Sequence, residues 1–129
     1  MSDTIVKVIP YRVDMDEPIK KTYLDTLLFT QDNEAHRFDI QLFRGQTQVE
    51  LPDGTTVKGY FVRHSDNATI EIDGSKASNV ASVSLKNACY STSGQFALFI
   101  KVLIGDVIST VFYCEGSIQN SITDTIVDA

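Results

Sequence analysis

The chain has 129 residues, no tryptophan and a formal net charge of −6. This length fits one domain with a hydrophobic core of its own. The acidic balance and the scattered basic residues argue against binding to nucleic acid or to an anionic membrane surface. The N-terminus lacks the pattern of a signal peptide, and no apolar run is long enough to span a bilayer, so we expect the protein to be made in a cytoplasm and kept there at least until assembly.

Residues 1–18 are interrupted by Pro10 and Pro18, and we expect them to form an N-terminal arm or an edge strand. A single β-sandwich domain is expected to follow over residues 19–129. Within it, residues 19–30 are compatible with a helix or a strand, and the threonine and aromatic residues favour the strand.

Further along the chain, apolar and polar residues alternate in short segments that are separated by turn signals about every ten residues. The alternation predicts strands over residues 36–43, 55–63, 69–74 and 80–85. Residues 86–90 are too few for a full helix and predict one short helical turn. The fold class predicted from this pattern is all-β, an antiparallel sandwich or a partly open barrel.

The longest hairpin is predicted over residues 94–118, with its turn at Gly105–Asp106. Its first strand places apolar residues at every even position, which are Phe96, Leu98, Ile100, Val102 and Ile104, so that face should be buried. Two registers of the second strand are possible. A two-residue loop sets Phe99 opposite Phe112, whereas a three-residue loop with a bulge turns Ile108, Phe112 and Cys114 towards the core.

Either register leaves apolar side chains of this hairpin outside the first core layer. We therefore predict a protein–protein interface that includes Phe99, Leu103 and Phe112. Replacement of Phe99 and Phe112 by serine is expected to abolish assembly and to keep the fold. Tyr90, just before the hairpin, is predicted to be a corner residue whose ring is buried and whose hydroxyl reaches backbone groups.

No pattern of residues predicts catalysis, and we expect no enzyme, no cofactor and no metal site. His64, Ser65 and Asp66 are sequence neighbours, which cannot adopt the geometry of a hydrolytic triad and predict a turn instead. The acidic pairs lack the spacing of a calcium loop and are expected to cap turns; they are Asp14 with Asp16, Asp66 with Asp73, and Asp124 with Asp128. Cys89 and Cys114 are expected to be buried free thiols.

Several segments in a fixed order point to a family. They are Val57-Lys-Gly-Tyr-Phe-Val-Arg63, Thr69-Ile-Glu-Ile-Asp-Gly74, Cys89-Tyr90 ahead of Gly94-Gln-Phe96, and Thr123-Asp-Thr-Ile-Val-Asp128. In this order, from residue 22 to the end, the chain resembles the N-terminal domain family of phage baseplate upper proteins. The resemblance implies an immunoglobulin-like β-sandwich, attachment to the tail hub, frequent trimeric assembly and no catalysis. Residues 2–21 are longer than the arm typical of the family, and relatives continue beyond the equivalent of Ala129, so receptor binding is not expected of these residues.

The resemblance and the residues together predict a structural protein of a phage or prophage tail or baseplate, located in the virion tail. It would dock and assemble through contacts with other tail or baseplate proteins and with copies of itself. An alternative is a non-catalytic carbohydrate-binding or adhesin-type module, which predicts that Tyr11, Tyr23 and Tyr60 group on one sheet or at one loop end. A small hydrolase would require a cleft with a perturbed histidine or paired carboxylates.

Overall fold

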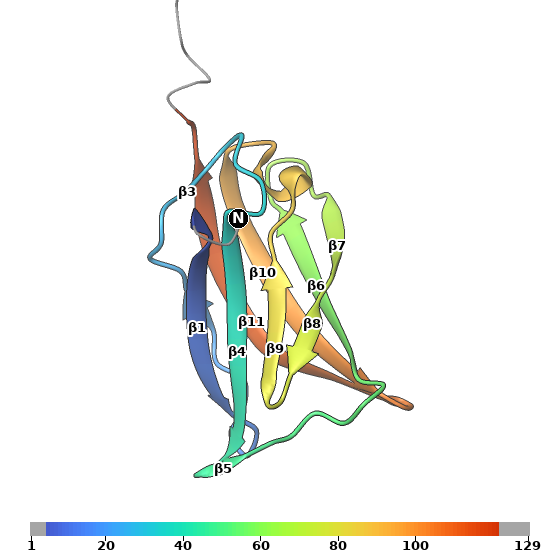
Figure 1. Cartoon of the computed structure of the whole chain (residues 1–129). Helices are drawn as coiled ribbons and strands as arrows, with labels where there is room; N and C mark the ends of the chain where they lie inside the picture. Colours follow the sequence, from blue (N-terminus) through green and yellow to red (C-terminus); the bar gives the residue numbers. More distant parts are fainter. Residues whose placement is uncertain (1–4, 122–129) are drawn as a thin grey trace, which may run out of the picture.

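The computed structural model describes residues 5–121 as two β-sheets packed face to face (Figure 1). The all-β sandwich predicted from the sequence is confirmed. The strands are β1 (Lys7–Asp14), β2 (Thr22–Tyr23), β3 (Leu28–Phe29), β4 (His36–Arg44), β5 (Thr47–Gln48), β6 (Thr56–Arg63), β7 (Thr69–Asp73), β8 (Ser75–Ala77), β9 (Val80–Ser84), β10 (Gly94–Ile104) and β11 (Val107–Gln119). The predicted helical turn is present as the 3₁₀ helix η2 (Asn87–Tyr90).

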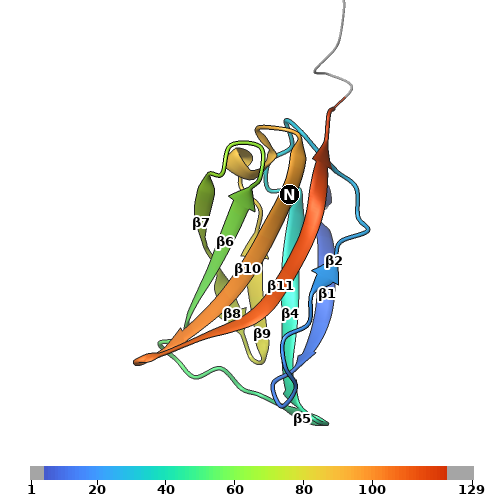
Figure 2. The same cartoon turned by 180° about the vertical axis from the view of Figure 1, so that it is seen from behind.

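Sheet A has the strand order β1-β4-β9-β8, and β5 adds to the end of β4. Sheet B has the order β2-β11-β10-β6-β7, and β3 pairs with the end of β11 (Figure 2). The chain passes from sheet B to sheet A at Gly74, between β7 and β8. A Cβ atom built on Gly74 would lie 2.6 Å from the Ser82 carbonyl oxygen and 2.7 Å from a methyl group of Val57. Glycine therefore permits the close backbone approach at this crossing.

Both sheets are mixed, so the prediction of a purely antiparallel sandwich needs correction. β1 runs parallel to β4, and β2 and β3 run parallel to β11. Parallel neighbours require a long connection, which the segment between β1 and β4 supplies. Sequence alternation indicates which residues share a face, but it does not show which strands are neighbours. It therefore did not reveal that these strand pairs are parallel.

β1 lies at the free edge of sheet A, and Pro10 stands within it. The Lys7 N–H donates to the carbonyl oxygen of Ala35, just before β4, and the Met15 N–H donates to that of Phe43 on β4. Successive backbone N–H groups of a strand point to opposite sides, and those of the odd-numbered residues point to β4. The backbone nitrogen of the even-numbered Pro10 therefore points to the free edge, where the missing N–H removes no hydrogen bond between strands. Proline at that position also hinders the addition of another strand.

Residues 19–30 form less strand than the sequence predicts, because only β2 and β3, of two residues each, pair with β11. Pro18 and the polar residues before β2 give no continuous alternation for a longer ladder. The Leu24 N–H donates to the Glu115 carbonyl oxygen, and the Thr30 N–H donates to that of Gln119. The segment is thus held to β11 at separated points.

A β-bulge determines the faces of the β10–β11 hairpin. Ile104 pairs with Val107 across a two-residue turn, but Ile100 pairs with Phe112 and Lys101 with Thr110. Val111 is the extra residue between these pairs, and it reverses the side on which every later side chain of β11 lies. The hairpin therefore combines the short loop of one predicted register with a bulge that the other register required.

The core lies between the sheets and is built from the even-numbered residues of β10 and their partners. Phe96, Leu98, Ile100 and Val102 are all buried, as the alternation predicts, whereas Ile104 at the tip is 39% exposed. Phe61 stacks on Phe96 with ring centroids 4.5 Å apart. Both rings belong to sheet B, and they fill part of the space between the two sheets.

Phe112 belongs to this core, with 4% of its surface exposed. Its ring centroid lies 4.7 Å from that of Tyr11 on β1 and 6.3 Å from that of Phe38 on β4. This corrects the prediction that Phe112 is part of a surface interface. The physical reason is the bulge at Val111, which turns Phe112 inward and leaves Phe99 outside.

We predict that Phe112→Ala lowers the free energy of unfolding by about 3–5 kcal/mol, because it empties a large buried volume. Phe99→Ala should cost only about 1 kcal/mol, since it removes one partly exposed cross-strand pair. Urea denaturation followed by circular dichroism measures both values. Equal losses in the two variants would contradict the placement of Phe112 in the core and Phe99 outside it.

Candidate functional site

The outer face of sheet B carries a row of three aromatic side chains. Phe99 on β10 is paired with Tyr60 on β6 and with Tyr113 on β11, so the three residues lie side by side across neighbouring strands. All three are partly exposed. We call Tyr60, Phe99 and Tyr113 the aromatic row. It arises because the neighbours of each residue in its strand point inward, which the period of two enforces.

The rings of the row are held in fixed positions. The Phe99 and Tyr113 centroids lie 4.8 Å apart, with an angle of 63° between the ring planes. The Tyr113 hydroxyl donates a hydrogen bond of 2.6 Å to Glu115 Oε2. The Lys101 ammonium lies 5.8 Å from the Tyr60 centroid, within the range of a cation–π contact. An ordered row loses little side-chain entropy when a partner covers it.

Charged pairs flank the row on both sides. Lys58 bridges Asp73 and Glu71 on β7, and Lys21 lies 3.3 Å from Glu115. The hydrogen bond to Asp73 raises the pKa of Lys58, and the hydrogen bond from Tyr113 lowers the pKa of Glu115. An aromatic centre with a polar rim is the usual composition of a protein–protein interface.

The structure brings two of the three predicted interface residues to this face. Phe99 and Leu103 are odd-numbered residues of β10, lie on its outer side and are partly buried. Leu103 pairs across the hairpin with Ile108, which is 64% exposed. The aromatic row therefore continues into an apolar pair nearer the turn, whereas Phe112 lies on the opposite side of the sheet.

Sequence reasoning missed Tyr113 and Ile108 as members of this face, and it named Tyr60 only for a sugar platform with Tyr11 and Tyr23. The structure does not bring those three together, because Tyr11 lies on β1 of sheet A and packs on Phe112. A signal for Tyr60 exists, because its neighbours Gly59 and Phe61 both belong to the inward face of β6. Tyr113 and Ile108 had no local signal, because the side of Tyr113 depends on the bulge at Val111 and the side of Ile108 depends on the length of the turn loop. Tyr23 on β2 is paired with Glu115 on β11 and lies at the edge of the same sheet.

Tyr90 is fully buried at the end of η2, as predicted for its ring. Its hydroxyl lies 2.9 Å from Nδ1 of the buried His36. Burial lowers the pKa of His36 and raises the pKa of Tyr90. Asp32 and Lys7 are the charged residues that act on the imidazole, with opposite effects. The buried contact thus joins the start of β4 to η2.

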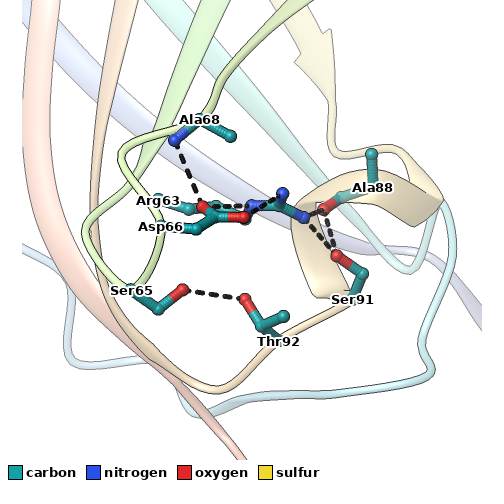
Figure 3. Close-up of polar contacts among 7 residues, drawn as sticks. All are labelled: Arg63, Ser65, Asp66, Ala68, Ala88, Ser91 and Thr92. Carbon is teal, nitrogen blue, oxygen red and sulfur yellow. Dashed lines mark hydrogen bonds and ion pairs between the residues drawn. The ribbon is translucent and has the colours of Figure 1, made fainter.

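The loop end of the sandwich is held by Arg63 (Figure 3). The guanidinium donates to both carboxylate oxygens of Asp66, at 3.2 and 2.6 Å, and to the Ala88 carbonyl oxygen at 3.0 Å. It also donates to the Ser91 hydroxyl. One side chain at the end of β6 therefore joins the β6–β7 turn to η2.

Residues 64–66 form the turn that the sequence predicts. Asp66 is occupied by Arg63 and by the Ala68 N–H, and both contacts lower its pKa. Ser65 Oγ lies 3.0 Å from the Thr92 hydroxyl. The side chains of Ser65 and Asp66 are thus engaged in the contacts of this loop end, whereas His64 is exposed and its backbone N–H donates to the Gln95 carbonyl oxygen.

The other described members of the predicted acidic pairs also have partners. Asp14 accepts the N–H groups of Asp16 and Gly45, which lower its pKa, and Asp16 pairs with Arg44 at 2.6 Å. Asp73 pairs with Lys58. Among residues 5–121, no three histidine, cysteine or acidic side chains gather as a metal site would require. Asp124 and Asp128 lie outside the described residues.

Both cysteines are buried free thiols, as the sequence predicts. Burial raises the pKa of Cys89 to about 11 and that of Cys114 to about 12. Neutral thiols of this kind are poor nucleophiles and act as small apolar side chains.

Comparison of structures finds the N-terminal domain of phage TP901-1 ORF48, with a TM-score of 0.51 and 9% sequence identity. The match covers 88% of this chain and 99% of that chain. The protein therefore shares its fold with a phage protein domain. No protein-family model matches the sequence, and no curated protein matches it. The structural likeness supports the phage resemblance at the level of the fold.

None of the helical segments within residues 5–121 has the length and apolar character that crossing a membrane requires.

The His36 environment predicts a pH dependence of stability. Because the folded-state pKa lies below the ordinary value of about 6.5, the unfolded state takes up the proton first as the pH falls. The stabilising contribution is complete above this value and is lost as the pH drops towards the lowered pKa. Thermal unfolding between pH 7.5 and 5.5 should show a falling midpoint. His36→Gln should make the midpoint depend less on pH. His64→Gln, which replaces an exposed histidine, should leave the pH dependence of the midpoint unchanged.

We also predict that Arg63→Ala lowers the free energy of unfolding by about 2 kcal/mol, because it leaves the Ala88 carbonyl oxygen and Asp66 without their charged donor. Arg63→Lys should retain only part of the lost stability, since a lysine ammonium cannot donate to both oxygens of Asp66 as the planar guanidinium does. Amide hydrogen exchange checks the location of the effect. Faster exchange confined to strands far from residues 64–68 and 87–91 would contradict it.

Proposed function

We propose that this protein is a structural component of a phage or prophage tail or baseplate, and that it assembles by docking the outer face of sheet B onto another tail or baseplate protein. The observation that carries the phage assignment is the fold shared with the N-terminal domain of phage TP901-1 ORF48. The resemblance in the ordered sequence segments supports the narrower assignment to a baseplate. The protein acts there without catalysis, in the virion tail, and as part of an oligomeric assembly.

The aromatic row supplies the docking surface. Tyrosine and phenylalanine at the centre of a patch contribute large contact areas, and the surrounding ion pairs exclude water and fix the orientation. Phe99 is the central member, because it lies between Tyr60 and Tyr113. The apolar pair of Leu103 and Ile108 extends the surface towards the hairpin turn.

A carbohydrate-binding module is the second candidate, because Tyr60 and Tyr113 lie on one sheet face with Phe99 between them. The geometry favours this role less. A sugar stacks on a flat aromatic surface, whereas the planes of Phe99 and Tyr113 are inclined by 63°. In addition, the Tyr113 hydroxyl already donates its hydrogen bond to Glu115, at 2.6 Å.

We predict that Phe99→Ser and Leu103→Ser remove the protein from phage particles and keep the fold. Immunogold electron microscopy of particles assembled with each variant measures incorporation at the tail tip, and circular dichroism checks folding. Val8→Ser is the matched control, because Val8 is an exposed apolar residue on sheet A. It should be incorporated as the unchanged protein is.

Two outcomes would contradict the proposal. Gold label on cells or in the medium but never on particles would overturn the assignment to the virion. Normal incorporation of both Phe99→Ser and Leu103→Ser would leave the virion assignment but overturn the docking face. Binding of the unchanged protein on a glycan array, lost in Phe99→Ser, would favour the carbohydrate-binding module.

A further inference from the structure

Lys101 lies in the middle of the docking surface. It stands on β10 between Phe99 and Leu103, and the three side chains share the outer side of the strand because they are two positions apart. β10 is an inner strand of sheet B, between β11 and β6. The Lys101 ammonium lies 5.8 Å from the ring centroid of Tyr60, another member of the aromatic row. A protein that covers Phe99 and Leu103 therefore also covers Lys101.

Lys101 has no counter-charge within the described part of the chain, residues 5–121, where it forms no ion pair. The other basic residues in the strands of sheet B do have carboxylate partners. Lys58 pairs with Glu71 and Asp73, and Arg63 pairs with Asp66. Lys101 thus differs from both, although it is the one that lies among the apolar residues of the docking surface.

The acidic side chains of the same sheet are already engaged elsewhere. The strands of sheet B hold three, which are Glu71 and Asp73 on the edge strand β7 and Glu115 on β11. Lys58 bridges the first two, which are more than half exposed. Glu115 lies 3.3 Å from Lys21 and accepts the Tyr113 hydroxyl.

The cross-strand neighbours of Lys101 do not supply a negative charge either. They are Lys58 on β6 and Thr110 on β11. Like charges directly opposite each other on neighbouring strands are unfavourable, and Lys58 is balanced by β7 whereas Lys101 is not. A negative charge placed over Lys101 would relieve this repulsion.

Covering Lys101 without a counter-charge would be unfavourable. An ammonium that loses its water requires a partner that replaces the lost hydration. The face of the Tyr60 ring attracts the ammonium, but a cation–π contact offsets only part of that cost. A carboxylate offsets more of it, because it adds a full opposite charge and a charge-assisted hydrogen bond.

We propose that the docking partner presents a carboxylate, from an aspartate or a glutamate, that pairs with Lys101 beside an apolar patch that covers Phe99 and Leu103. This inference rests on the docking role proposed above for the outer face of sheet B, and it adds the chemistry of the partner. Phe99 and Leu103 fit many apolar surfaces, whereas Lys101 disfavours a surface with a basic group at this point. Lys101 is thus the residue of this face that selects the partner.

Three variants of Lys101 test the proposal by immunogold electron microscopy of assembled particles. Lys101→Glu opposes two carboxylates and should lower incorporation at the tail tip at least about tenfold. Lys101→Met keeps an unbranched apolar side chain without the charge. It should also lower incorporation, because the partner's carboxylate is left buried without a counter-charge. Lys101→Arg keeps the charge and should be incorporated nearly as well as the unchanged protein.

Lys20→Glu is the matched control for the change in charge. Lys20 is largely exposed on the connection between β1 and β2, outside the strands of sheet B, so this variant should be incorporated normally. Circular dichroism confirms that every variant is folded. Particles selected for recovery of Lys101→Glu incorporation should carry a second change that replaces an aspartate or glutamate of another particle protein. Second changes that leave all those acidic residues in place would overturn the proposal.

The Phe99→Ser variant separates this inference from the docking role on which it rests. Loss of Phe99→Ser with normal incorporation of Lys101→Met would overturn the carboxylate and leave the docking face. This holds even where Lys101→Glu is lost, because that result shows a partner that excludes a negative charge but supplies none. Normal incorporation of Phe99→Ser and Leu103→Ser would overturn the docking face and this inference with it.

Discussion

The position of the bulge at Val111 determines what the two faces of sheet B can do. One inserted residue turns Phe112 and Cys114 towards sheet A and leaves Tyr113 and Glu115 on the outside. Without it, Phe99 would lie opposite Phe112 on the outer face, and the core would lose the ring that contacts both Tyr11 and Phe38. The packing of β1 on the rest of the molecule and the composition of the outer face thus follow from one local irregularity.

The sequence predicted the elements whose stability depends on local alternation. Strands β4, β6, β7, β9, β10 and β11, the inward residues of β10 and the helical turn at η2 follow from a period of two and from turn chemistry. The parallel pairing of β1 with β4 was not predicted, because it joins residues such as Ile9 and Phe38 that are far apart in the chain. Residues 19–30 were predicted as a strand, but β11 offers them only isolated backbone partners.

The candidate site was predicted only in part, for the same physical reason. Phe99 and Leu103 lie on a strand whose two faces differ clearly, so the alternation of β10 alone places them outside. Which faces Phe112 and Tyr113 occupy depends on whether Val111 pairs with β10 or is the extra residue of a bulge. Because the residues before and after Val111 are apolar, the sequence pattern does not show where the faces exchange. Tyr90 was located correctly as a buried corner, but its contact with His36 depends on a long-range approach.

The edges of the sandwich restrict where assembly contacts can form. Pro10 blunts the free edge of β1, β8 is only three residues long, and the edge strand β7 carries Glu71 and Asp73, which Lys58 neutralises. Short, charged or proline-containing edges oppose the addition of further strands. The docking surface proposed above accordingly lies on the outer face of sheet B, around Phe99 and Leu103, and not at a strand edge.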